Sequence, residues 1–269
     1  MTRIKVCCIS SLEEARTAIN MGAHALGLVG PMPSGPGIIS NELIAEIAHA
    51  VRDEDVRTFL LTSETEADAI IAHYRKCKTT TIQLVDAVEN EVYAKLRSSL
   101  PEVELVQVIH VLDENSIKEA LEKAAFVDYI LLDSGNPNLQ TKELGGTGRT
   151  HNWSISKKIV EKCPVPVFLA GGLHPGNIAE AKSMVGPMGL ISAAEYAAKE
   201  NWTKRKSLNS LTAQMARTKN CPNCKEDHSV MFRVQYKPSD KTWYFLCEKC
   251  VLEVKPGNSH YCYGGTWKG

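Results

Sequence analysis

Residues 3–21 read RIKVCCISSLEEARTAINM. Ile4–Ile9 is a short run rich in β-branched side chains, which favours a strand. Leu12–Met21 repeats its apolar residues with helical spacing, and Ser11 with Glu14 three residues later forms a capping box at its start. The stretch therefore predicts one β/α unit, a strand followed at once by a helix.

The same unit recurs along the chain. Further predicted strands are Ala25–Val29, Arg57–Thr62, Thr80–Leu84, Leu105–His110, Tyr129–Leu132, Val167–Ala170 and Met188–Ser192. Further helical patterns are Asn41–Val51, Glu66–Lys76, Asn90–Ser98, Asn115–Lys123, Ser154–Cys163 and Asn177–Met184. Eight strands alternating with helices over about 200 residues predict an α/β fold of the (β/α)8 TIM-barrel type. A doubly wound open sheet is the structural alternative.

The composition is that of an ordinary globular protein. Of 269 residues, 43% are hydrophobic and 23% are charged. Lys+Arg and Asp+Glu are both 31, so the charge of the whole chain indicates no polyanionic partner. The N-terminal sequence lacks a signal-like apolar stretch, and no later segment offers the roughly 18 uninterrupted apolar residues of a membrane span. We therefore expect a cytoplasmic protein without a membrane partner.

The cysteines mark a break in composition near the C-terminus. The chain has 9 cysteines, and those at 221, 224, 247, 250 and 262 fall in the last stretch of the chain. Cys221-Pro-Asn-Cys224 and Cys247-Glu-Lys-Cys250 are two CxxC turns, and four thiolates at this spacing can close a tetrahedral Zn²⁺ site. We predict a small β zinc-ribbon domain over residues 213–269, after a barrel over residues 1–212.

The predicted ribbon offers little charge for binding nucleic acid. From residue 213 onward, nine Lys/Arg face five Asp/Glu, and a Zn(Cys)4 centre itself carries a charge of −2. The aromatic tail Tyr261–Trp267 could stack a base or pack against the barrel, and packing is the expectation. Nucleic acid is therefore an unlikely partner and remains only a minor alternative.

Three segments of the predicted barrel carry its chemistry. The first is Lys5-Val6-Cys7-Cys8-Ile9-Ser10, where Cys7 shares a strand face with Lys5 and Cys8 is expected to point the other way. The second is Ile130-Leu131-Leu132-Asp133-Ser134, with the later loop Gly145-Gly146-Thr147-Gly148. The third is Leu169-Ala170-Gly171-Gly172-Leu173, ahead of a helix. Glycine turns before helices let backbone N–H groups approach a phosphate.

In this order and spacing, the segments resemble phosphoribosylanthranilate isomerase, a tryptophan-pathway barrel enzyme, over roughly residues 3–195. The resemblance implies an Amadori rearrangement of a phosphorylated aminoaldose to an aminoketose, with no cofactor for the barrel chemistry. It implies Cys7 as the base and Asp133 as the acid. Together with the glycine turns, it places phosphate or substrate at residues of three loops: Gly145, Gly146, Gly148, Gly171, Gly172 and Ser192.

Other positions depart from the family pattern. Gly37 stands where the family has an Arg that grips the anthranilate carboxylate, and a glycine cannot replace that clamp. Leu190 is aligned with an Asp that contacts the substrate amine, Ala194 with a glycine of the phosphate turn, and Val85 with a His. An isomerase with an altered phosphorylated substrate is therefore the first interpretation. A non-catalytic barrel that binds a phosphate ligand is the alternative, and the oligomeric state stays open.

Overall fold

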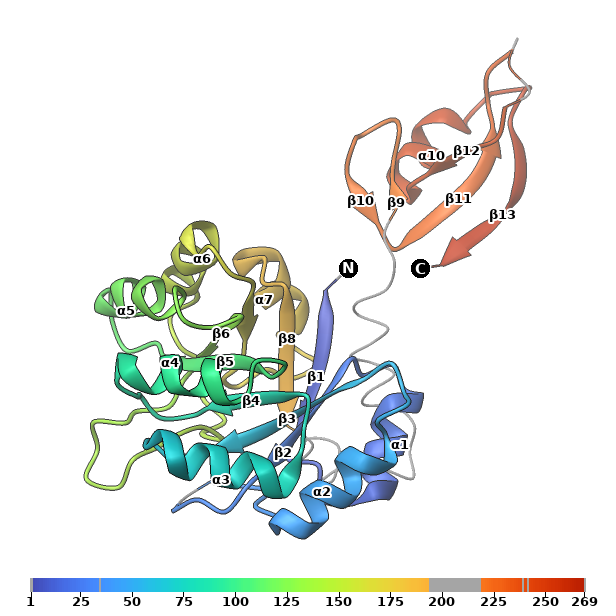
Figure 1. The fold of residues 1–269 in the computed structure, drawn as a ribbon. Helices are drawn as coiled ribbons and strands as arrows, with labels where there is room; N and C mark the ends of the chain where they lie inside the picture. The colour runs from blue at the N-terminus through green and yellow to red at the C-terminus, as the bar shows by residue number, and fades with distance from the viewer. Residues whose placement is uncertain (1, 34, 194–218, 239, 241, 269) are drawn as a thin grey trace. The chain divides into compact units, whose positions relative to one another are not determined.

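The computed structural model describes residues 2–33, 35–193, 219–238, 240 and 242–268 (Figure 1). The chain forms two compact units, Met1–Leu211 and Thr212–Gly269. The domain boundary predicted between residues 212 and 213, and Ala194 at the end of the last barrel strand, lie outside the described residues.

The first unit is a closed barrel of eight parallel strands (Figure 1). The strands are β1 (Arg3–Cys7), β2 (Ala25–Val29), β3 (Arg57–Thr62), β4 (Thr81–Leu84), β5 (Glu104–His110), β6 (Tyr129–Asp133), β7 (Val167–Leu169) and β8 (Gly189–Ala193). β8 pairs with β1 from Arg3–Gly189 to Cys7–Ala193, which closes the sheet. The closure confirms the predicted TIM-type fold and excludes the open doubly wound sheet.

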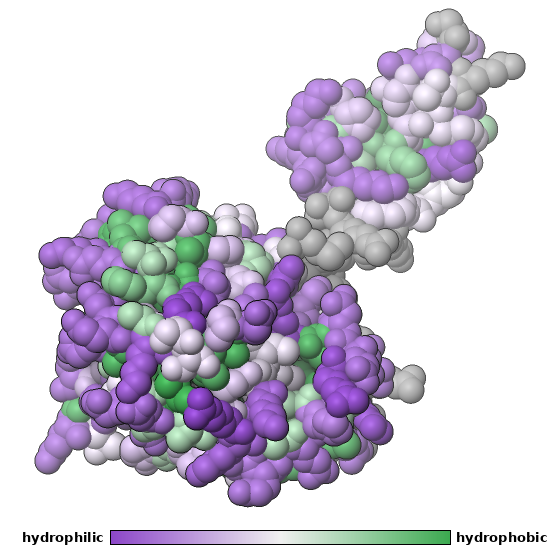
Figure 2. All heavy atoms as spheres, viewed as in Figure 1, coloured by the Kyte–Doolittle hydropathy of each residue, from purple (hydrophilic) through white to green (hydrophobic). Residues whose placement is uncertain are grey.

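Helices alternate with the strands and cover the outside of the barrel (Figure 1). They are α1 (Leu12–Asn20), α2 (Asn41–Ala50), α3 (Ala67–Cys77), α4 (Asn90–Ser99), α5 (Asn115–Lys123), α6 (Trp153–Lys162) and α7 (Ile178–Val185). Figure 2 shows mostly hydrophilic residues on the visible outer face of this unit, with smaller apolar patches between them. The apolar residues of these helices face the strands, as expected of amphipathic helices in a barrel.

The cap of α1 confirms half of the predicted capping box. The Ser11 side chain accepts a hydrogen bond from the Glu14 amide at 3.1 Å. The Glu14 carboxylate accepts from the amide and hydroxyl of Ser10, each at 2.8 Å, instead of from the amide of Ser11. The backbone N–H groups of Ser10 and Glu14 therefore both have acceptors, so α1 can begin after a short turn that follows β1.

Inward-facing side chains fill the barrel in layers, as strand alternation requires. The interior cluster contains Cys7, Ala25, Val29, Phe59, Leu61, Val85, Val106, Val108, Leu131, Phe168, Ala170 and Ile191. Where β3, β5 and β6 begin, Arg57 pairs with Glu104, and both bond the Tyr129 hydroxyl. The amino ends of the strands are thus closed by a polar network, and the opposite end is left for a site.

The second unit is built from short strands and one helix. A two-stranded sheet pairs β9 (Lys219–Asn220) with β10 (Asp227–His228). A three-stranded sheet has the order β12 (Tyr244–Leu246), β11 (Val230–Gln235), β13 (Cys262–Lys268), and α10 (Glu248–Val254) follows β12. β11 and β12 form an antiparallel pair from Phe232–Leu246 to Val234–Tyr244.

The aromatic tail of the chain belongs to this second unit. It forms β13, which pairs with β11 from Val230–Lys268 to Gln235–Cys262. Trp267 packs against the buried cluster around Met231 and Val234. The tail thus completes the sheet of its own unit, a role that was not predicted from the sequence. Among the described residues, no helix is both long and apolar enough to cross a membrane.

Candidate active site and metal centre

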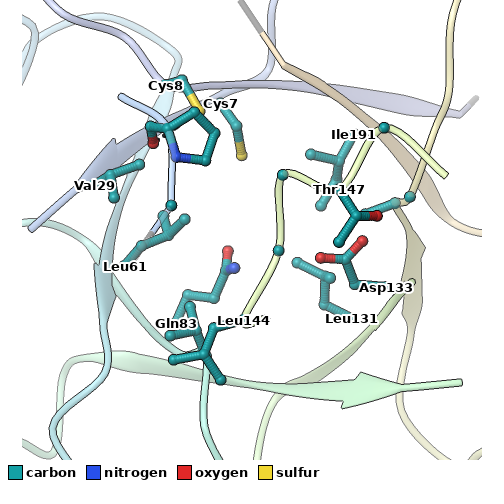
Figure 3. A pocket seen from close by; sticks show the side chains of 18 of the residues that line it. Cys7, Cys8, Val29, Leu61, Gln83, Leu131, Asp133, Leu144, Thr147 and Ile191 are labelled. Atoms are coloured by element: carbon teal, nitrogen blue, oxygen red, sulfur yellow. Dashed lines mark hydrogen bonds between the residues drawn. The ribbon is translucent and has the colours of Figure 1, made fainter. Parts of the chain in front are cut away.

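A cavity of about 360 Å³ lies at the carboxyl ends of the barrel strands (Figure 3). Its wall includes residues from the ends of β1, β2, β3, β4, β6 and β8 and from the loops after β2, β6 and β7. This is the end of a (β/α)8 barrel at which loops are free to vary around a rigid scaffold. The barrel therefore presents one well-formed candidate site within the described residues.

Cys7 and Asp133, predicted as base and acid, both line this cavity. Each ends its strand, β1 or β6, and each is only 9% exposed. Their side chains extend into the cavity from different walls (Figure 3). The structure thus brings together two ionisable groups that are far apart in the sequence.

Asp133 lies in an environment that favours its protonated form. Burial raises the pKa of the Asp133 carboxyl above its usual value of 3.8. The Ser134 amide, which donates to Asp133 Oδ1 at 2.8 Å, acts in the opposite direction, as do the charges of His110 and Lys5. The net effect is the one that a general acid requires.

Strand alternation predicted that Cys8 would point away from the site, and this prediction is wrong. β1 ends at Cys7, and Cys8 has a φ of +62°, in the left-handed region. That rotation turns its side chain back toward the cavity, which it lines, and its thiol donates to the carbonyl oxygen of Pro36 at 3.6 Å. Alternation holds only while the backbone stays extended, so the end of the strand reverses the expected side.

The glycines predicted to bind phosphate lie together at the cavity. Gly145, Gly146, Gly148, Gly171 and Gly172 all line it, and all have positive φ. A Cβ on Gly172 would lie 2.6 Å from the carbonyl carbon of Arg149, so the two glycine loops touch here. Only glycine allows this approach, which supports the predicted cradle of backbone N–H groups.

The predictions at β8 need correction. Leu190 was aligned with a substrate-contacting residue, but it is 1% exposed and absent from the cavity wall. Its neighbour Ile191 lines the cavity instead, because successive side chains of a strand point to opposite faces. The backbone of Ser192 pairs with Val6 of β1, and its side chain lies outside the described part of the structure.

The sequence interpretation gave no role to two polar residues inside the barrel. Lys5 has no exposed surface, donates a hydrogen bond to Gln83 Oε1 and lies 4.3 Å from the ring centroid of Phe59. Burial lowers the pKa of Lys5, while contact with Cys7 and the charge of Asp133 oppose that shift. A lysine two positions before Cys7 on the same strand face was the available signal.

The loop after β6 lies across the site and is held at several points. Lys142 Nζ lies 2.5 Å from Asp86 Oδ2, at the end of β4. The Thr147 hydroxyl lies 2.8 Å from that of Ser134. A Cβ on Gly145 would lie 3.0 Å from Asp133 Oδ2, so this loop covers the acid. No motif in the sequence indicated the Lys142–Asp86 pair.

The second unit contains a cluster of four cysteines that could hold a metal ion. The sulfur atoms of Cys221, Cys224, Cys247 and Cys250 all lie within 4.8 Å of one another. The Cys247 amide donates to Cys221 Sγ at 3.5 Å. Burial disfavours ionisation of Cys221, but several backbone N–H donors outweigh it and bring the pKa to about 6. The Nε2 atom of His228 lies 3.4 Å from Cys224 Sγ, beside the cluster.

Comparisons with known proteins show the family of the barrel. Residues 4–193 match the family model of N-(5'phosphoribosyl)anthranilate (PRA) isomerase. N-(5'-phosphoribosyl)anthranilate isomerase 2 of Methanosarcina mazei is 33% identical over 193 residues, which are 71% of this chain and 84% of that protein. Residues 219–269 match a family described as a domain of unknown function, DUF8622.

Solved structures show the same barrel. Phosphoribosyl anthranilate isomerase from Thermotoga maritima has a TM-score of 0.66 at 24% identity, and the match covers 80% of this chain and 98% of that one. A second, solved in complex with reduced 1-(o-carboxyphenylamino)-1-deoxyribulose 5-phosphate, has a TM-score of 0.59 at 24% identity, with 72% and 88% covered. The fold, the sequence identity and the family match agree, and the chain belongs to the N-(5'-phosphoribosyl)anthranilate isomerase family.

Proposed function

We propose that the barrel converts a phosphorylated N-glycosylamine to the corresponding aminoketose phosphate by an Amadori rearrangement. The observation that carries this proposal is the placement of Cys7 and Asp133 on different walls of one cavity, beside two glycine loops. The substrate named for the relatives is N-(5'-phosphoribosyl)anthranilate. The reaction rearranges one molecule, so it needs no oxidant, reductant or cofactor.

Asp133 acts as the general acid. It donates its proton to the ring oxygen of the sugar, the C1–O bond breaks, and a protonated Schiff base forms at C1. Burial keeps this carboxyl protonated to higher pH than an exposed aspartate. The loop that carries Gly145 covers the carboxyl and limits its contact with water.

Cys7 acts as the general base. Its thiolate removes the proton from C2, and the electron pair moves to form the C1–C2 double bond of an enolamine. Tautomerisation then gives the ketose. The buried Lys5 contacts the Cys7 side chain and supplies positive charge next to the sulfur. A cation beside a thiol favours the thiolate, which is the reactive form.

We propose that the phosphate group of the substrate binds at the glycine loops. Gly145, Gly146, Gly148, Gly171 and Gly172 supply a concave run of backbone at one part of the cavity. Among the described lining residues there is no lysine or arginine, so backbone N–H groups are the donors available there. The backbone of Ser192, one residue before the end of β8, is proposed to complete the cradle.

The test is turnover of N-(5'-phosphoribosyl)amines by single variants. We expect Cys7→Ala and Asp133→Asn to lower kcat by about 10²–10⁴-fold in folded protein, the range for loss of a general acid or base. Cys163→Ala is the matched control, because Cys163 ends α6 away from the cavity and its loss should leave kcat unchanged. Full activity in both site variants would reject the assignment. Binding of substrate by the native protein without turnover would favour the alternative, a non-catalytic barrel.

For the second unit, we propose that Cys221, Cys224, Cys247 and Cys250 bind one Zn²⁺ with a structural role, as in a zinc ribbon. Four sulfur donors grouped within 4.8 Å suit a closed tetrahedral site. A unit of this size has a small apolar core, so the metal would supply much of its folding free energy. Because both the Cys7 base and this centre need reduced sulfur, we place the protein in the cytoplasm.

A further inference from the structure

The cavity wall has ionisable side chains of one charge type among its described residues. Its ionisable lining residues are Cys7, Cys8 and Asp133, each of which is neutral or negative. None of the described residues that line it is a lysine, arginine or histidine. Lys5, the nearest buried cation, is engaged with Gln83 and Phe59 inside the barrel and does not line the cavity.

The part of the wall away from the glycine loops is apolar. It is formed by residues of β2, β3 and the segments that follow β2 and β4, namely Val29, Met32, Leu61 and Val85, and we call it the apolar subsite. Pro36 also lines the cavity but borders Gly146, where a Cβ would lie 2.4 Å from Pro36 Cδ, so it is not part of this subsite. Val29, Leu61 and Val85 are buried in the core of the barrel. Figure 3 shows Cys8, Val29 and Leu61 on one side of the cavity, and Asp133 and Thr147 across from them.

Cys8 and Gly37 close the apolar subsite to larger side chains. A Cβ on Gly37 would lie 2.5 Å from Cys8 Cβ and 2.9 Å from Cys8 Cα. Gly37 has a φ of +74°, so a side chain here would also be strained. No arginine or lysine can therefore extend from position 37 while Cys8 is present. The Cys8 side chain occupies the space from which a cation would reach the cavity.

We propose that the isomerase acts on phosphorylated glycosylamines of neutral, apolar amines, and that Cys8 and Gly37 determine this specificity. The inference rests on the proposed function. With the phosphate at the glycine loops, the substituent of the amine lies in the apolar subsite. A carboxylate placed there loses its hydration and finds no cation among the described lining residues, whereas an unsubstituted aromatic ring buries apolar surface at no such cost.

The experiment compares two substrates that differ only by a carboxylate. Ribose 5-phosphate condenses with aniline and with 2-aminobenzoate to give the two N-glycosylamines, and NMR or chemical reduction detects the aminoketose products. We expect kcat/KM for the aniline adduct to exceed that for the 2-aminobenzoate adduct by about 10- to 100-fold, the cost of an unpaired charged group. A ratio near one, or a preference for the 2-aminobenzoate adduct, would overturn the inference but leave the proposed function standing.

Turnover of neither adduct would overturn the proposed function itself, so the two failures can be told apart. The double variant Cys8→Gly/Gly37→Arg provides the second arm, because it removes the contacts with Cys8 Cβ and Sγ and adds the cation together. The contact of 2.9 Å with the Cα of residue 8 remains and requires a small backbone shift. We expect the double variant to lower the aniline preference at least about tenfold, mainly through KM for the 2-aminobenzoate adduct. An unchanged ratio in a folded double variant would show that these two residues do not determine specificity.

Discussion

The ammonium of Lys5 contacts the side chain of Cys7, two residues further along the same inward face of β1. Lys5 has no exposed surface, and Gln83 of β4 accepts a hydrogen bond from its ammonium. A fully buried ammonium is costly to hold inside a barrel, and burial accordingly lowers its pKa. Lys5 therefore connects the buried interior of the barrel with Cys7, the proposed base in the cavity wall.

Replacing Lys5 with Met should separate activity from stability. We expect kcat to fall about 10- to 100-fold, because the thiolate of Cys7 loses its neighbouring cation. The melting temperature should stay equal or rise, since Met fills similar space without a buried charge. Steady-state kinetics and thermal melts measure the two effects. A variant that keeps full kcat would show that Lys5 has only a structural role.

Because the pKa of Asp133 is raised, replacing this carboxyl should stabilise the fold, and the size of the gain should depend on pH. A carboxyl whose folded pKa exceeds its unfolded value near 3.8 stabilises the fold below that value, and this contribution is lost as pH rises through the folded pKa. Asp133→Asn should therefore melt higher than the native protein at neutral pH, although it is inactive. The difference should shrink as pH falls toward 4. Melts recorded across this range test the sign, and a difference that grows on acidification would contradict it.

The Lys142–Asp86 pair should hold the loop over the site. Asp86 is buried, so removing its partner leaves an uncompensated carboxylate and loosens the segment that carries Gly145 and Gly146. We expect Lys142→Met to lower kcat/KM about tenfold. Lys157→Met is the control, since Lys157 forms only an exposed pair with Glu161 on α6 and its loss should change little.

Two glycines with similar backbones provide a test of the phosphate cradle. Gly172 and Gly186 have φ values of +59° and +67°, so an alanine at either position pays similar backbone strain of about 1 kcal/mol. Only at Gly172 would the new Cβ meet the Arg149 backbone, whereas nothing lies within 4 Å at Gly186. Gly172→Ala should raise KM for the phosphorylated substrate about tenfold or more, and Gly186→Ala should not. Equal effects on KM would argue against the cradle.

The metal proposal predicts one bound Zn²⁺ per chain, measured by atomic absorption on the full-length protein. Cys250→Ser should abolish binding, because Cys250 is a buried member of the four-sulfur cluster. Cys262→Ser should retain the metal, since Cys262 is exposed and lies outside that cluster. Removal of zinc by a chelator should unfold the second unit. The fluorescence of Trp243 and Trp267 should then shift toward that of tryptophan in water. Retention of zinc by Cys250→Ser would contradict the ligand set.

Much of the barrel could be predicted because its signals are local. β2 and β3 begin and end at the residues that β-branched periodicity indicated, and α5 matches its predicted range. The pairing of Cys7 with Asp133 came from motif order, which places both at carboxyl ends of strands. In a closed barrel those ends converge on one cavity, so the topology brings both side chains to its wall.

The remaining differences concern geometry that local sequence signals do not determine. The orientation of Cys8 depended on a single left-handed residue, which alternation cannot anticipate. Leu190 was aligned with a substrate-contacting Asp of the family pattern, yet it does not line the cavity, because neighbouring residues of a strand point to opposite faces and Ile191 takes that side. β13 was missed because Gly264 and Gly265 interrupt its pattern, and its pairing with β11 contains an irregular register.

The contact between Cys8 and Gly37 also constrains how this pocket can evolve. An arginine acquired first at position 37 would collide with Cys8 and carry a strained backbone. A glycine acquired first at position 8 relieves the strain of a left-handed cysteine and opens the space. A route that changes position 8 first therefore meets fewer close contacts at position 37 than a route that changes position 37 first. The order of the two substitutions, and not only their identity, therefore affects how much strain an intermediate carries at this contact.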